Sequence, residues 1–263
     1  MQETDLALLT EAARHAGEIA KKYFQNDPSV THKPGGAGPV TDADLAVDAM
    51  LEASLRLART DYGWLSEETE DNAARLKTKR QFVVDPIDGT RAFINGSKDW
   101  AHALAVVEDG LVVSAVVYLP MHDLLFAATK GGGATVNDRP IAVTNAALGN
   151  ATVLGAKPNF ESHFWKGGQV PPVTRAFRSS LAYRLCLVAQ GEFDGMLTLR
   201  PSWEWDIAAG ALIITEAGGV VSDQYAAPLQ FNNPHPQVPG VLAAGAQLHA
   251  ALAARLEPQP ANT

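Results

Sequence analysis

The chain has 263 residues, of which 46% are hydrophobic and 19% are charged. This balance is typical of a folded globular protein and excludes a disordered or collagen-like chain. The formal net charge of −8 argues against binding to nucleic acid polymers or to anionic membranes, because both attract basic surfaces. An anionic substrate would therefore need bound cations to offset its charge.

Cys186 is the only cysteine, so no intramolecular disulfide can form and a reducing compartment is expected. Its apolar neighbours predict a buried thiol. Residues 1–24 lack the basic and apolar segments of a signal peptide, and no apolar run approaches the roughly 20 residues that span a bilayer. We expect a cytoplasmic protein.

Apolar residues at helical spacing predict helices over residues 5–24 and 41–59. The second helix should have Leu45, Val47, Met50, Leu51, Leu55 and Leu57 on its apolar, buried side. Between the helices, residues 25–39 are rich in proline and glycine and are expected to form a loop.

Beyond residue 80 the apolar pattern changes to that of an antiparallel sheet, with strands over 81–84, 102–107, 111–118, 124–129 and 134–136. Further strands are predicted over 151–155, 195–199, 220–221 and 238–243, and helices over 180–190, 205–217 and 246–255. The tail 258–263 is expected to fray. We therefore expect an α+β half over 1–145 and an α/β half over 146–263, packed as one unit of layered helices and sheets.

The densest chemical motif is residues 85–90, which read Asp-Pro-Ile-Asp-Gly-Thr. Asp85 and Asp88 follow a buried strand, and Pro86 stiffens what we interpret as a turn. Hard divalent cations bind such carboxylates, and a short helix over 91–94 would present backbone amides to a phosphate. The same string is also typical of a simple turn.

Three other acidic segments each have a structural alternative. Residues 66–70, which include Glu67 and Glu68, are equally typical of a solvated loop. Thr41 and Asp44 fit the capping box of the second helix. Asp206 follows a tryptophan at a helix start, where it is either a first-turn carboxylate favoured by the helix dipole or a ligand. The small residues 208–210 after it would let another element approach closely.

In combination these motifs resemble the inositol monophosphatase family of metal-dependent, lithium-sensitive phosphomonoesterases. The family's order is kept along nearly the whole chain, with Val-Thr-x-x-Asp at 40–44, Glu-Glu at 67–68, Asp-Pro-Ile-Asp-Gly-Thr at 85–90 and Trp-Asp-x-Ala-Ala-Gly at 205–210. The resemblance implies a layered αβαβα sandwich, a small phosphorylated metabolite as substrate and a homodimer. It also implies two to three Mg²⁺ ions per site.

By motif position, the resemblance implies a metal-ligand set of Glu67, Asp85, the carbonyl of Ile87, Asp88 and Asp206. It further implies that Thr90, with Asp44, orients and deprotonates the attacking water, and Glu67 is included among the catalytic residues.

The resemblance also assigns groups that contact the phosphate. The amides of Gly89 and Thr90 would bind it, and Lys33 in the glycine-rich loop would close over the site.

The substrate motifs are closest to bacterial 3′(2′),5′-bisphosphate nucleotidases, which share Ser-Ser-Leu (179–181) and Glu-Trp-Asp (204–206). We predict that Ser180 of the first motif binds substrate. We predict the same of Arg184 and Arg200, because a guanidinium suits a second phosphate. Both arginines could instead be salt-bridged surface residues. Ala182 departs from the lysine that often follows Ser-Ser-Leu in those nucleotidases.

Three alternatives remain open. An inositol-1-monophosphatase ranks second, because Leu199 stands where those enzymes place a polyol-binding carboxylate. A histidinol phosphatase ranks third, supported by Thr-Arg-Ala-Phe at 90–93. A catalytically silent regulatory protein is the alternative from a different class, although a binding module has no need for so many metal-type carboxylates.

Overall fold

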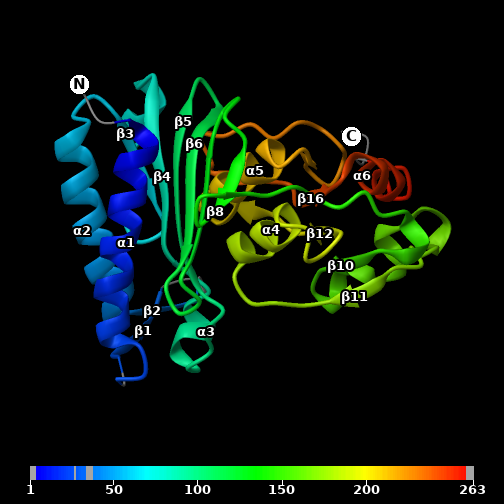
Figure 1. Ribbon diagram of the computed structural model, residues 1–263, viewed down its shortest axis with the longest axis horizontal. Coiled ribbons are helices and arrows are strands. Elements are labelled where there is room, and N and C mark those ends of the chain that lie inside the picture. Colours follow the sequence, from blue (N-terminus) through cyan, green and yellow to red (C-terminus); the bar gives the residue numbers. More distant parts are fainter. Residues whose placement is uncertain (1–3, 27, 34–37, 259–263) are drawn as a thin grey trace.

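Five alternating layers of helix and sheet make up the fold, as the family resemblance predicted. The computed structural model describes residues 4–26, 28–33 and 38–258. In Figure 1 the layers follow one another as α1 with α2, a seven-stranded sheet, α4 with α5, a five-stranded sheet, and α6. Part of the predicted loop and most of the predicted frayed tail lie outside the described residues.

The described helices have the bounds α1 (Asp5–Tyr23), α2 (Asp42–Ala58), α3 (Thr90–Ile94), α4 (Leu181–Ala189), α5 (Glu204–Glu216) and α6 (Ala246–Ala253). Short 3₁₀ turns occur at Ala73–Lys77, Leu148–Asn150, Lys157–Phe160, Ser162–Phe164 and Lys166–Gly168. None of the helices in the described part of the chain has the length and apolarity needed to cross a bilayer.

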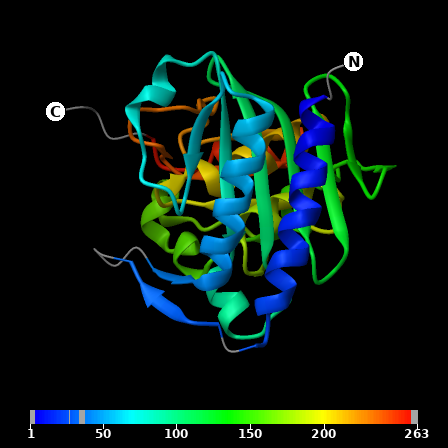
Figure 2. The ribbon, with the colours of Figure 1, turned by 90° about the vertical axis from the view of Figure 1, so that its left-hand side faces the viewer.

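Helices α1 and α2 lie side by side on one face of the seven-stranded sheet (Figure 2). The predicted capping box of α2 is present, with Thr41 and Asp44 as its two members. Leu51 and Leu55 are fully buried, but Leu45 and Leu57 are 51% and 82% exposed, so their predicted burial was wrong. At 100° per residue, the two exposed leucines point away from the buried row through Val47, Leu51 and Leu55.

The seven-stranded sheet runs in the order β3-β4-β5-β6-β7-β8-β9. Its strands are β3 (Gly63–Ser66), β4 (Arg80–Asp88), β5 (Ala101–Glu108), β6 (Leu111–Leu119), β7 (Leu124–Thr129), β8 (Ala134–Val136) and β9 (Arg139–Pro140). β3 is parallel to β4, and the remaining neighbours are antiparallel. The predicted turn at residues 85–88 was wrong, because β4 continues through Asp88.

The five-stranded sheet runs in the order β11-β10-β12-β16-β14. Its strands are β10 (Thr152–Leu154), β11 (Thr174–Ala176), β12 (Gly195–Thr198), β14 (Val220–Ser222) and β16 (Val241–Ala244). Two small antiparallel sheets pair β1 (Val30–His32) with β2 (Pro39–Thr41), as a hairpin, and β13 (Ser202–Trp203) with β15 (Gln237–Val238), which α5 and β14 separate in the sequence. The first of these was missed when residues 25–39 were interpreted as a loop, because three-residue strands give no periodic signal.

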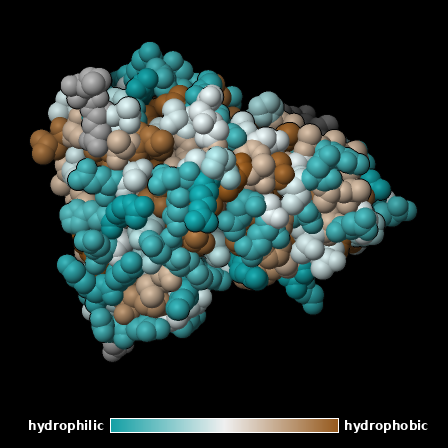
Figure 3. Space-filling model, viewed as in Figure 1, coloured by the Kyte–Doolittle hydropathy of each residue, from teal (hydrophilic) through white to brown (hydrophobic). Residues whose placement is uncertain are grey.

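Helices α4 and α5 fill the space between the two sheets. A Cβ on Gly210 would lie 2.6 Å from Leu185 Cβ, so glycine is required for α5 to approach α4 this closely, as the small residues at 208–210 predicted. Cys186 is fully buried in this layer, as expected. The face seen in Figure 3 intersperses hydrophilic and hydrophobic residues.

Candidate metal centre

Three carboxylates from the β3 end, β4 and α5 converge at the carboxyl end of β4. Oxygens of Glu67, Asp85 and Asp206 all lie within 4.8 Å of one another. Glu67 directly follows β3, whose parallel pairing with β4 aligns Ser66 with Val84, and Asp206 lies in the first turn of α5. The fold thus brings together groups that are up to 139 positions apart in the sequence, as 206 − 67 shows.

The Asp85 carboxylate has an environment that fits a cation. Both of its oxygens are buried and have no hydrogen-bond partner among the described residues. Burial raises the pKa of Asp85 well above its usual range, and the negative charges of Glu67, Asp88 and Asp206 raise it further. The pKa of Asp206 is raised in the same way, chiefly by burial and then by Asp88. A buried, unpaired, crowded carboxylate is costly unless a proton or a metal ion neutralises it, and carboxylate oxygens are ligands that hard divalent cations prefer.

Asp88 is held by the start of α4. Its Oδ2 accepts hydrogen bonds from Ser180 Oγ over 2.7 Å and from the Ala182 amide over 2.6 Å. Burial raises the pKa of Asp88 to about 6, although these two hydrogen bonds oppose the rise. The predicted substrate residue Ser180 is therefore placed against a predicted metal ligand, and its oxygen also accepts from the Tyr183 amide at 3.0 Å.

Asp44 serves both the capping box and the site. Its Oδ2 accepts hydrogen bonds from the amide and hydroxyl of Thr41 at 2.8 and 2.5 Å. Its Oδ1 lies 3.2 Å from Thr90 Oγ1, which also lies 3.2 Å from the Ile87 carbonyl oxygen. Burial is the main reason that the pKa of Asp44 is raised. The capping and functional interpretations of this aspartate are thus compatible.

The backbone turns sharply between Asp88 and Thr90. Gly89 has φ +100°, and a Cβ there would lie 3.2 Å from the Asp99 carbonyl oxygen. Glycine is needed for both reasons. Gly89 directly precedes α3, whose first residue is Thr90.

Lys33 binds both members of the Glu-Glu pair. Its Nζ lies 2.8 Å from Glu67 Oε1 and 2.8 Å from Glu68 Oε2. Burial raises the pKa of Glu68 to about 7 despite the lysine. Glu67 and Glu68 are half-buried, so the solvated-loop alternative does not describe them.

Sequence reasoning missed Asp48, a residue of α2 that binds the segment carrying Glu67 and Glu68. Its Oδ1 accepts from Ser66 Oγ over 2.5 Å and its Oδ2 from Thr69 Oγ1 over 2.7 Å. The two hydroxyls flank the Glu-Glu pair, so one buried carboxylate fixes both ends of it. The available signal was an acid one turn after Asp44 on the buried side of α2.

Arg184 and Arg200 both have charges that act on Asp206, and Arg200 is exposed. Arg184 packs 4.6 Å from the centre of the Phe177 ring, and its Nε donates to the Arg178 carbonyl over 2.6 Å. Burial lowers the pKa of Arg184, while the charges of Asp88 and Asp206 oppose this. Neither arginine has a carboxylate oxygen within 4.0 Å in the described part of the chain, so the surface salt-bridge alternative is not observed there.

Glu204, one of the acids that carry the nucleotidase resemblance, is instead a structural group. It is fully buried and accepts from the amides of Asn232 and Asn233 at 2.7 and 2.8 Å. Its two tryptophan neighbours, Trp203 and Trp205, stack with ring centres 4.7 Å apart.

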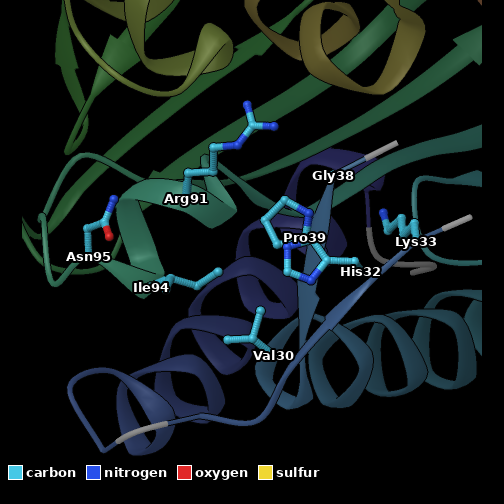
Figure 4. Close-up of a pocket in the computed structure, with 8 residues that line it drawn as sticks. All are labelled: Val30, His32, Lys33, Gly38, Pro39, Arg91, Ile94 and Asn95. Carbon is cyan, nitrogen blue, oxygen red and sulfur yellow. The ribbon is translucent and has the colours of Figure 1, made fainter. Parts of the chain in front are cut away.

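A pocket of about 380 Å³ lies beside α3, with Val30, His32, Lys33, Gly38, Pro39, Arg91, Ile94 and Asn95 around it. Figure 4 shows the β1–β2 hairpin on one side of this pocket and α3 on the other. It adjoins the centre through Lys33 but contains none of the clustered carboxylates.

Comparison with known proteins gives concordant results. Residues 1–260 match the model of the inositol monophosphatase family. The chain is 33% identical to an inositol-1-monophosphatase of Rhizobium meliloti, covering 83% of this chain and 85% of that one, and 33% identical to the Nus factor SuhB of Escherichia coli, covering 83% and 84%. The solved IMPase of Thermotoga maritima superposes with a TM-score of 0.79 at 27% identity, covering 95% of this chain and 94% of that one.

Proposed function

Because the chain belongs to the inositol monophosphatase family and is thus a phosphatase of phosphate monoesters, we propose that it hydrolyses a small phosphorylated metabolite that carries a second anionic group. The leading candidate is a 3′(2′),5′-bisphosphate nucleotide. The observation that carries the metal-dependent part is the buried Asp85 carboxylate, whose oxygens have no partner among the described residues and face Glu67 and Asp206.

Mg²⁺ is the cofactor of this proposal, since the family depends on it. Glu67, Asp85, the Ile87 carbonyl, Asp88 and Asp206 would hold two ions, with a third at Glu67. Bound Mg²⁺ supplies Lewis-acid charge neutralisation of the phosphate and lowers the pKa of a bound water. The net charge of −8 is then no obstacle to an anionic substrate.

The remaining roles belong to the chain itself. Thr90 Oγ1 donates its one proton to Asp44 Oδ1 or to the Ile87 carbonyl, so its lone pairs are available to accept a proton from the attacking water. Asp44, with its raised pKa, is suited to take up that proton through Thr90. The amides of Gly89 and Thr90 bind the phosphate in this proposal.

Specificity rests on Arg184 and Arg200. Their charges act on Asp206, and Arg184 also acts on Asp88, which supports a role for both guanidinium groups in binding an anionic substrate. Guanidinium donors favour a second phosphate over a neutral polyol. Leu199 is buried in the core, so the polyol-binding carboxylate of inositol enzymes has no counterpart at that position.

Inositol 1-phosphate is the second candidate, favoured by the relatives named inositol-1-monophosphatase. A phosphate-release panel with 3′-phosphoadenosine 5′-phosphate, inositol 1-phosphate, histidinol phosphate and fructose 1,6-bisphosphate under Mg²⁺ distinguishes them. Preference for inositol 1-phosphate would overturn the bisphosphate assignment. Preference for histidinol phosphate would do the same.

The competing proposal is a regulatory binding protein without catalytic activity. Relatives named Nus factor SuhB are the reason to test it. Phosphate release that EDTA abolishes and Li⁺ inhibits supports catalysis. Ligand binding without turnover would support the regulatory role. A homodimer and cytoplasmic residence complete the proposal, tested by sedimentation velocity and by cell fractionation.

A further inference from the structure

The strand that carries Asp85 and Asp88 contains a β-bulge. Asp85 pairs with Ala103 and Asp88 pairs with Ala101, so two residues of β4 stand opposite a single residue of β5, His102. In a regular strand, side chains three positions apart point to opposite faces of the sheet. The extra residue of the bulge corrects this and turns both carboxylates to one face.

That face is the one covered by α4 and α5. Ala101 and Ala103, the partners of the two aspartates, belong to the core beneath these helices. His102 lies between them and points to the opposite face, where its ring centre is 5.5 Å from that of Trp100 and 6.5 Å from that of Tyr118. His102 therefore sits behind the metal centre, on the side of α1, and does not face a substrate.

The His102 ring is nevertheless bonded to the bulge. Its Nδ1 forms a hydrogen bond with the carbonyl oxygen of Pro86, one of the two β4 residues that stand opposite His102 in the bulge. A carbonyl oxygen only accepts, so Nδ1 carries the proton. The ring is fully buried, and its Nε2 has no partner among the described residues. An apolar side chain would fill this space without burying an unpaired nitrogen, so the Nδ1–H donor is the property that distinguishes histidine here.

We propose that His102 is a positioning residue for the metal centre: its Nδ1–H bond to the Pro86 carbonyl fixes the bulge that turns Asp85 and Asp88 to one face. The proposal rests on the proposed function, because it is the binding of Mg²⁺ that needs both carboxylates on that face. Without the bond, the Pro86 carbonyl loses its buried donor and the bulge can relax toward registers that separate the two acids.

Four variants test this role, with Mn²⁺ as the probe and its affinity measured by electron paramagnetic resonance of the free ion. His102→Leu keeps much of the side-chain volume and removes the donor. His102→Gln moves the donor to about the position of Nε2, and His102→Asn keeps an N–H at about the position of Nδ1. Leu104→Ala, two residues along β5 and equally buried, is the matched control for a core defect that leaves the bulge intact.

We expect His102→Leu and His102→Gln to weaken Mn²⁺ binding by roughly 10-fold or more, the range seen when residues that orient metal ligands are lost. His102→Asn should bind closer to the unaltered protein than either of them. Leu104→Ala should lose stability without losing Mn²⁺ affinity. The Mg²⁺ concentration for half-maximal phosphate release should rise in the same order. In the unaltered protein, nitrogen NMR at pH 7 should show a neutral His102 with its proton on Nδ1.

Equal Mn²⁺ affinity in His102→Gln and Leu104→Ala would overturn the proposal, and this comparison holds even if His102→Leu does not fold. A proton on Nε2 would also overturn it. If the unaltered protein bound no Mn²⁺, the proposed function itself would fail, which is a different result from a variant that binds as well as the unaltered protein.

Discussion

Ser180 Oγ lies 2.7 Å from Asp88 Oδ2, although the two residues are 92 positions apart. This contact joins the start of α4 to the end of β4, and the Ala182 amide adds a second bond to the same oxygen. The carboxylate is thereby fixed in one orientation before any ion binds, which lowers the entropic cost of metal binding.

Asp88→Asn tests the metal role of this carboxylate. The amide oxygen can still accept from Ser180 and Ala182, so the fold should be preserved, whereas the negative charge needed for the cation is lost. We expect phosphate release under Mg²⁺ to fall by about 100-fold or more, equivalent to roughly 3 kcal/mol of transition-state stabilisation. Circular dichroism in EDTA provides the control for folding. Loss of folded structure in this variant would contradict the assignment.

The raised pKa of Asp88 predicts that the stability of the metal-free protein depends on pH, and Asp88→Asn tests this. The folded-state pKa of Asp88, about 6, exceeds its usual value of 3.8. Between these values the folded protein keeps a proton that the unfolded chain has released. The contribution of Asp88 to the free energy of unfolding is therefore complete below about pH 4 and is lost as the pH rises through about 6.

Denaturation of both proteins in EDTA measures this effect. Asp88→Asn and the unaltered protein should have similar free energies of unfolding at pH 4. At pH 7 the variant should be more stable by up to roughly 3 kcal/mol, an upper bound from two pKa units. Groups whose pKa does not depend on Asp88, such as His102, are present in both proteins and cancel. The pKa of Asp85 and of Asp206, which Asp88 raises, should be less elevated in the variant. If the difference in free energy of unfolding between the two proteins did not change with pH, burial would not raise the pKa of Asp88.

Lys33→Ala should affect turnover more than folding. Lys33 is half-buried and pairs with Glu67 and Glu68 at the rim of the site, and partly exposed ion pairs contribute only about 1 kcal/mol or less to stability. We expect kcat/KM to fall by about 10-fold or more, with a change in melting temperature of only a few degrees. Lys79→Ala, at an exposed lysine paired with Glu108, is the control. A collapse of the melting temperature in Lys33→Ala alone would identify Lys33 as a structural residue.

Asp48→Asn should loosen the segment that carries Glu67. The amide offers one acceptor oxygen, so Ser66 or Thr69 loses its partner, at a cost of about 1–2 kcal/mol. Because Glu67 lies between those two residues, the Mg²⁺ concentration for half-maximal activity should increase. Titration of phosphate release with Mg²⁺ measures this. Asp42→Asn on the exposed side of α2 is the comparison, and an equal effect there would remove the special role of Asp48.

Residue patterns alone identified the main helices of this chain and its family. Helix periods identified α1 and α2, the Thr41–Asp44 pair predicted the capping box, and four short acidic motifs in family order carried the resemblance to a phosphatase family. These inferences succeeded because helix periodicity, capping and motif spacing depend on neighbouring residues. The same local logic failed where the signal was short or irregular, as for the β1–β2 hairpin and the predicted turn at 85–88.

Which acids meet depends on how distant segments pack. The parallel pairing of β3 with β4 and the placement of the α5 start beside them bring Glu67, Asp85 and Asp206 together. A bulge, invisible in the residue pattern, turns Asp88 to the same face, and His102 lies behind it in a part of β5 that sequence analysis treated as a plain strand. Such convergence depends on strand register and helix packing between distant segments, whose physical determinants are spread over the whole core.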